Sequence, residues 1–131
     1  MKKIKKKTLT LDLSTWRCGG VNNVLPYGLG RGDTELLNNK NYMCCLGQFA
    51  LQLGMKREDI LYVGTPLEVG KSIPLLSNRR EGGLSNTVLS SNCMIINDNE
   101  LTTIDEKILL IRKELKKKGI TLRVKNRKKN L

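Results

Sequence analysis

The stretch YMCCLGQFALQLG, residues 42–54, is the longest nearly uncharged apolar run in the chain. Its Met, Leu, Ala and Gln residues favour a helix. Gln48 and Gln52 are its polar side chains, and because they lie four residues apart they would form one narrow solvated stripe on an otherwise buried helix. Gly54 stands where helices commonly end in a left-handed residue. We predict a central core helix over residues 43–53, too short to span a bilayer.

Alternation of apolar and polar side chains predicts a strand near each end of the chain. Residues 8–13 place Leu9, Leu11 and Leu13 on one face, and residues 120–125 alternate in the same way. We expect antiparallel pairing of the first and last strands, which would bring the two basic tails side by side.

The C-terminal helix carries clear start and stop signals. Thr103 and Glu106 have the capping-box spacing, and Gly119 is suited to a left-handed stop. Earlier in the chain, two short apolar segments flank the polar residues 90–92, and a turn is expected at residues 97–99.

These elements predict one α+β domain in which a central buried helix and a C-terminal capped helix pack on a small, mostly antiparallel sheet. The expected organisation is a basic N-terminal tail over residues 1–7, a single domain over residues 8–124 and a basic C-terminal tail over residues 125–131.

The net charge of +12 is concentrated at the two ends of the chain. Residues 1–7 and 123–131 each carry five basic residues and no acidic ones, which leaves +2 for residues 8–122. Clustered cations of this kind bind nucleic-acid phosphates with little base selectivity, although they could equally serve solubility alone. The predicted nucleic-acid contacts are Lys2, Lys3, Lys5, Lys6, Lys7, Arg123, Lys125, Arg127, Lys128 and Lys129.

Two further stretches combine arginine with glycine. Residues 27–33 have a glycine at every second position around one arginine, and residues 77–83 read as a hydrophilic loop with paired arginines before two glycines. Backbone amides and guanidinium groups can together hold a phosphate, and the alternative for both stretches is a solvated loop or turn. The candidate phosphate-binding residues are Gly28, Gly30, Arg31, Gly32, Arg79 and Arg80.

The residue types argue against catalysis and against a metal or other cofactor. The chain has no histidine, and its four cysteines do not have the spacing of a metal site. We expect small buried thiols in a reducing compartment. An activated thiol at Cys18, Cys44 or Cys45 is the remaining catalytic alternative.

Four features of the chain occur together: Cys44-Cys45-Leu46-Gly47, the later Gly64-Thr65-Pro66-Leu67, the Asn97-Asp98 turn and the helix-Gly-Ile-strand unit of residues 105–124. In these features the chain resembles a set of short, uncharacterised proteins of phages and prophages. The resemblance covers residues 28–124 and its motifs are structural. It implies a viral accessory protein, for example in counter-defence, that works in the cytoplasm of an infected or lysogenic bacterial host.

The sequence therefore predicts a non-enzymatic accessory protein that binds an anionic partner, either nucleic acid or a phosphate-bearing nucleotide. The alternatives are a sponge for a small nucleotide messenger and an inhibitor that blocks a host defence protein. No membrane partner is expected, and homo-oligomerisation stays open.

Overall fold

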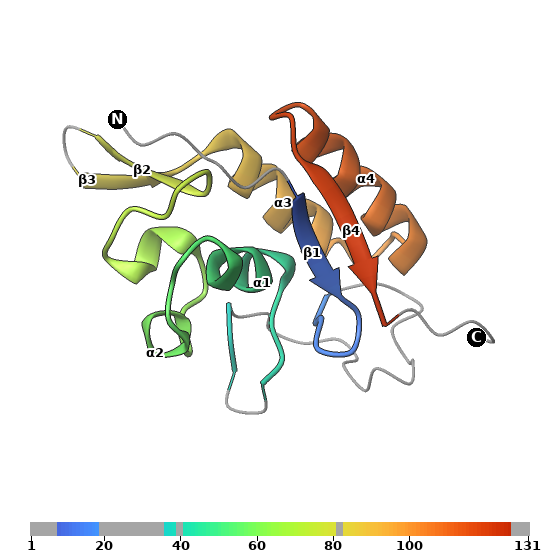
Figure 1. Cartoon of the computed structure of the whole chain (residues 1–131), viewed down its shortest axis with the longest axis horizontal. Coiled ribbons are helices and arrows are strands. Elements are labelled where there is room, and N and C mark those ends of the chain that lie inside the picture. Colours follow the sequence, from blue (N-terminus) through green and yellow to red (C-terminus); the bar gives the residue numbers. More distant parts are fainter. Residues whose placement is uncertain (1–7, 19–35, 39–40, 81–82, 127–131) are drawn as a thin grey trace.

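The computed structural model describes residues 8–18, 36–38, 41–80 and 83–126, with the backbone alone of Leu67, Arg79 and Arg80. The helices are α1 (Cys45–Gln52), α2 (Arg57–Ile60), α3 (Val88–Asp98) and α4 (Ile104–Lys116), together with the 3-10 helix η1 (Pro66–Val69). The strands are β1 (Thr8–Asp12), β2 (Ser77–Arg80), β3 (Gly83–Asn86) and β4 (Thr121–Lys125). They form one small α+β domain, as predicted (Figure 1).

Helix α1 is the predicted core helix, and glycine allows it to pack closely. Leu46, Phe49 and Ala50 are fully buried. A Cβ atom built on Gly47 would lie 1.7 Å from the backbone carbonyl oxygen of Leu36. Only glycine therefore lets α1 approach the 36–38 segment this closely.

Helix α4 begins and ends where the sequence predicts. The Thr103 hydroxyl accepts from the Glu106 amide at 3.1 Å, and the Glu106 carboxylate accepts from the Thr103 amide at 3.0 Å. At the other end Gly119 has a φ of 74°, and the Ile120 amide donates to the Leu115 carbonyl at 3.0 Å. These bonds close a Schellman-type turn, so that β4 folds straight back along α4.

The first and last strands pair in parallel, and the antiparallel prediction is wrong. Leu9 lies opposite Leu122 and Leu11 opposite Val124. The tight turn at Gly119 fixes the direction of β4 relative to α4. The direction of α4 relative to β1 depends on tertiary packing, which the alternation of apolar and polar residues does not reveal. The chain thus enters β1 and leaves β4 at opposite ends of the pair. The basic residues 1–7 and 127–131 themselves lie outside the described residues.

Two segments in the middle of the chain are more regular than predicted. The apolar segments around residues 90–92 belong to one helix, α3, which starts at the Thr87 cap. Its polar Ser90 is tolerated in the interior because its hydroxyl donates to the Leu76 carbonyl at 2.8 Å. Residues 77–80 form β2, which pairs antiparallel with β3, so the predicted hydrophilic loop is a hairpin strand. The sheet content is therefore one parallel and one antiparallel pair rather than mostly antiparallel.

The elements form two unequal parts around a shared core (Figure 1). On one side, β1 and β4 lie side by side, with α1 next to β1, and α3 and α4 behind the pair. On the other side, the β2–β3 hairpin projects away from β4. Within the described ranges, no helix is both long and apolar enough to cross a bilayer.

Candidate functional site

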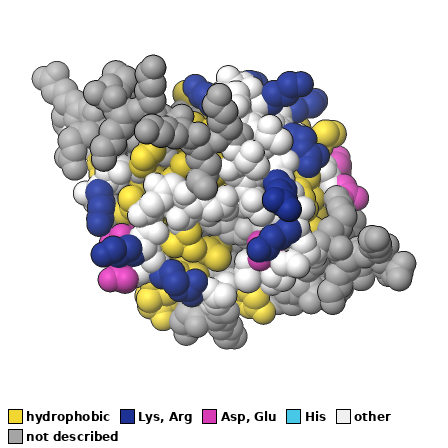
Figure 2. Space-filling view, in the orientation of Figure 1, with side chains coloured by type: hydrophobic (Ala, Val, Ile, Leu, Met, Phe, Trp, Pro, Cys, Tyr) yellow, Lys and Arg dark blue, Asp and Glu magenta, His cyan; other side chains and the backbone are white. Residues whose placement is uncertain are grey.

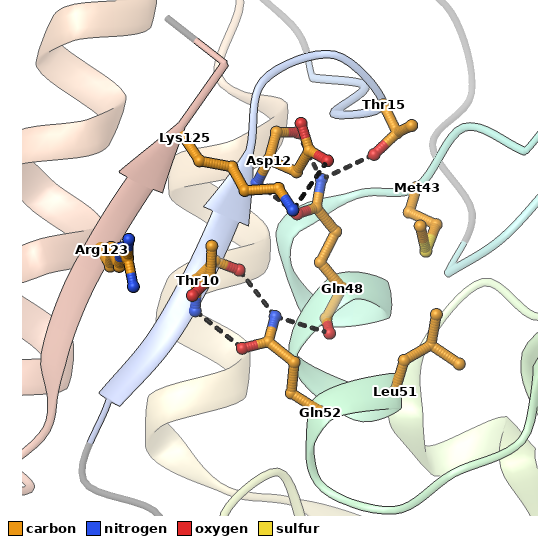
Figure 3. A pocket seen from close by; sticks show the side chains of 9 residues that line it. All are labelled: Thr10, Asp12, Thr15, Met43, Gln48, Leu51, Gln52, Arg123 and Lys125. Atoms are coloured by element: carbon orange, nitrogen blue, oxygen red, sulfur yellow. Dashed lines mark hydrogen bonds and ion pairs between the residues drawn. The ribbon is translucent and has the colours of Figure 1, made fainter.

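A groove opens over β1 between β4 and α1 (Figure 3). Its volume is about 460 Å³. Its walls are formed by side chains of the β1–β4 pair, of α1 and of the segments that adjoin these elements. The lining residues are Thr10, Asp12, Thr15, Met43, Gln48, Leu51, Gln52, Arg123 and Lys125.

The floor of the groove is built from two glutamine side chains that act as a substitute strand. Gln52 accepts from the Thr10 amide at 2.7 Å and donates to the Thr10 carbonyl at 2.7 Å. Gln48 does the same with Asp12, at 2.6 Å and 2.9 Å. The predicted solvated stripe is therefore wrong, because the four-residue spacing matches alternate residues of β1 and Gln48 is only 4% exposed.

One wall of the groove is basic. Arg123 and Lys125 are both exposed and, two residues apart on β4, project from the same face of the strand. The Lys125 ammonium lies 4.0 Å from the Asp12 carboxylate, which is the limit of an ion pair. No carboxylate of the described residues forms an ion pair with Arg123.

Asp12 is the acidic member of the groove, and its neighbours keep it ionised. Partial burial opposes the charged form, but hydrogen bonds from Asn126 at 2.7 Å and from the Ser14 hydroxyl at 2.7 Å outweigh that cost. The pKa of Asp12 consequently falls below its usual value. Its carboxylate is engaged locally, so it offsets the charge of Lys125 more than that of Arg123.

The basic wall continues onto α4. In Figure 2, Lys and Arg side chains follow β4 and the adjoining part of α4 along the right-hand half of the face. The exposed basic residues of these two elements and the turn between them are Arg112, Lys113, Lys116, Lys117, Lys118, Arg123 and Lys125. Lys117 pairs with Glu114 at 2.9 Å, an exposed contact that contributes little to stability. We call this set the basic band.

The structure brings together only part of the predicted site. Arg123 and Lys125 stand in the groove wall, and Lys125 belongs to β4 rather than to a tail. Arg79 and Arg80 lie in β2, at the opposite side of the molecule from β4 (Figure 1). The remaining predicted residues lie outside the described ranges: Lys2, Lys3, Lys5, Lys6, Lys7, Gly28, Gly30, Arg31, Gly32, Arg127, Lys128 and Lys129.

The cysteines at the start of α1 have the environment of structural thiols. Cys44 and Cys45 are buried, and burial raises the pKa of Cys44 to about 12 and that of Cys45 well above its usual value. A thiolate nucleophile requires the opposite shift. Cys93 is buried beside them, and the Cys45 thiol donates to its carbonyl at 3.8 Å. This geometry argues against an activated thiol at Cys44 or Cys45.

Asn97 ties three parts of the core together, a role that its predicted turn position concealed. Its side-chain oxygen accepts from the Trp16 indole at 2.6 Å and from the Cys45 amide at 3.0 Å, and its amide nitrogen donates to the Arg17 carbonyl at 3.1 Å. Because all these groups are satisfied internally, Asn97 has a structural role.

Lys107 is a buried cation with a structural explanation. Its ammonium group donates to the carbonyls of Ile96 and Asn99 and to the Thr102 hydroxyl. The two carbonyls lie at the end of α3, where the helix dipole favours a cation. Burial lowers the pKa of Lys107, but its three acceptors use its donors fully.

The bonding of Gln48 and Gln52 to a neighbouring strand has a signal in the sequence, whereas the burial of Lys107 has none. Two amides four apart on an otherwise apolar helix fit alternate residues of a neighbouring strand as well as they fit water. Lys107 is one of several lysines in a charged helix, and only the packing of α3 against α4 distinguishes it.

Comparison with protein-family models, curated proteins and solved structures finds no match to this chain. In the described ranges, no group of three or more His, Cys, Asp or Glu side chains is placed to hold a metal ion. The groove presents amides, hydroxyls, one carboxylate and two cations, and the cations can bind an anion.

Proposed function

We propose that the protein is a non-enzymatic accessory protein of the phage type that binds nucleic acid through its phosphate backbone. The observation that carries the proposal is the position of Arg123 and Lys125, which are exposed on one wall of the groove and form the part of the basic band that reaches it. Phosphate contacts of this kind supply affinity without sequence preference.

The lining of the groove favours a phosphate backbone over a small nucleotide as the ligand. Among its nine lining residues none is aromatic, and only Met43 and Leu51 are apolar. Nucleobases are usually held by stacking on aromatic rings or on a guanidinium plane. Trp16 is buried in a bond to Asn97, so among the lining residues only Arg123 offers a plane for stacking. A messenger sponge would therefore have no aromatic platform for its base in this groove.

The test is a salt titration of oligonucleotide binding, measured by fluorescence anisotropy on the full chain and on the Arg123→Ala/Lys125→Ala variant. The parent's affinity should fall by orders of magnitude between about 50 and 200 mM salt. The double variant should bind more weakly, and its slope of log affinity against log salt should be shallower by about 1.5.

Lys56→Ala/Arg57→Ala is the matched control, because it also removes two exposed cations but from the start of α2, away from β4. Equal losses in the two double variants would show a general charge effect and contradict a role for the groove wall. Saturable binding of a mononucleotide with the same affinity as an oligonucleotide would support the sponge instead.

A further inference from the structure

The outer edge of β4 has backbone groups without partners among the described residues. The Leu13 amide donates to the Lys125 carbonyl at 3.1 Å, so Lys125 turns its backbone groups toward β1. In a parallel pair the residues that face the partner strand alternate with those that face away. The amides and carbonyls of Leu122 and Val124 therefore point outward, away from β1.

This edge is flanked by cations on two sides. Arg123 and Lys125 project from the solvent face of β4. On α4, Glu114 faces α3, because it accepts from Asn92 at 3.0 Å. Arg112 and Lys116 are each two residues from Glu114, about 200° around the helix, and so lie on the flank away from α3.

That flank of α4 borders the outer edge of β4. Helix α3 packs against α1, and α1 packs against β1, so α3 lies on the β1 side of the pair. The view in Figure 1 agrees, with α1, β1 and β4 in sequence across the molecule and α4 behind β4. Four exposed cations thus flank a line of strand groups that have no partner in the part of the chain that the structure describes.

We propose that the outer edge of β4 is a docking site for an extended, acidic segment of a partner protein, which adds to the β1–β4 pair as a third strand. Main-chain bonds to Leu122 and Val124 provide the attachment, and acidic side chains next to Arg123 and Lys125 provide selectivity. A second copy of this chain is disfavoured, because antiparallel pairing of two β4 strands about their centre would place Arg123 opposite Arg123.

The proposal does not depend on nucleic-acid binding, but both ligands use Arg123 and Lys125. An acidic strand and an oligonucleotide should therefore exclude one another. A partner that offers such a strand would compete with nucleic acid for the same face.

The experiment uses the full chain and an eight-residue labelled peptide that alternates Glu with Val. We expect the peptide to bind at low salt and to be displaced by an oligonucleotide. Arg123→Glu/Lys125→Glu should weaken its binding roughly tenfold or more and favour the peptide that alternates Lys with Val. The control, Lys56→Glu/Arg57→Glu, should bind like the parent, because its changes lie on α2.

Peptide N-methylation separates strand addition from plain charge attraction without altering the protein. Methyl groups on all Val nitrogens and on all Glu nitrogens give two peptides of equal charge. Strand addition requires that one set abolishes binding and the other retains it, because only alternate amides face β4. Equal binding of the two methylated peptides, equal loss of both, or a dimer of the free chain in sedimentation would overturn the proposal.

Discussion

At the outer edge of β1, the side-chain amides of Gln48 and Gln52 bond to the strand's outward backbone groups, whereas at the outer edge of β4 the equivalent groups have no such partners among the described residues. The difference follows from the neighbouring helices. Helix α1 comes close to β1 and presents amides at the spacing of the strand, while α4 lies behind β4 and presents cations. One edge is closed by packing, and the other is protected by charge, which a polyanion or an acidic strand can neutralise.

Displacing α1, which carries the glutamines of the closed edge, should have the largest effect. In Gly47→Ala, the new Cβ would collide with the backbone carbonyl of Leu36, which cannot move as a flexible side chain does. We expect a loss of about 3 kcal/mol or more in the free energy of unfolding, measured by urea denaturation. A variant with parent-like stability would show that α1 does not pack so closely.

Removing one amide should weaken the closed edge without moving the helix. Gln48→Met preserves side-chain length but leaves the amide and carbonyl of Asp12 unpaired in a part-buried site. The expected loss is about 2–3 kcal/mol by urea denaturation. A loss below about 0.5 kcal/mol would mean that water replaces the glutamine easily.

Gln52→Met provides the graded comparison. Gln52 makes the same pair of bonds with Thr10 but is more exposed than Gln48, so water can reach the groups that it leaves. We expect a loss of about 1 kcal/mol in the same assay. A larger loss than in Gln48→Met would contradict the ranking by burial.

These residues also show where sequence reasoning succeeds and fails. The α+β class, the core helix and the limits of α4 follow from local signals, such as the Thr103 cap and Gly119. The parallel direction of β4 and the strand-like role of Gln48 depend on contacts between segments distant in the chain. Arg123 is among the predicted nucleic-acid contacts, but only the fold shows that it lines the groove and that Arg79 lies on the other side of the molecule.

The smallest effect concerns Asp12, whose amide bonds to Gln48 and whose carboxylate faces Lys125. Its folded pKa lies below the usual 3.8, so the unfolded chain binds protons more readily. The stabilisation is present above about pH 4 and is lost as pH falls through the folded pKa. Because Asp12 is partly exposed, the contribution should stay below about 1 kcal/mol. Asp12→Asn should flatten the pH dependence of stability in that range, whereas an unchanged acid slope would assign it to other carboxylates.

The asymmetry between the two edges is tested most directly by residue-resolved amide hydrogen exchange of the free chain, followed by NMR. The amides of Thr10 and Asp12 should be protected by the glutamines, and those of Arg123 and Lys125 by β1, while Leu122 and Val124 exchange much faster than their neighbours in the same strand. Protection of Leu122 and Val124 equal to that of Arg123 and Lys125 would contradict an open edge on β4.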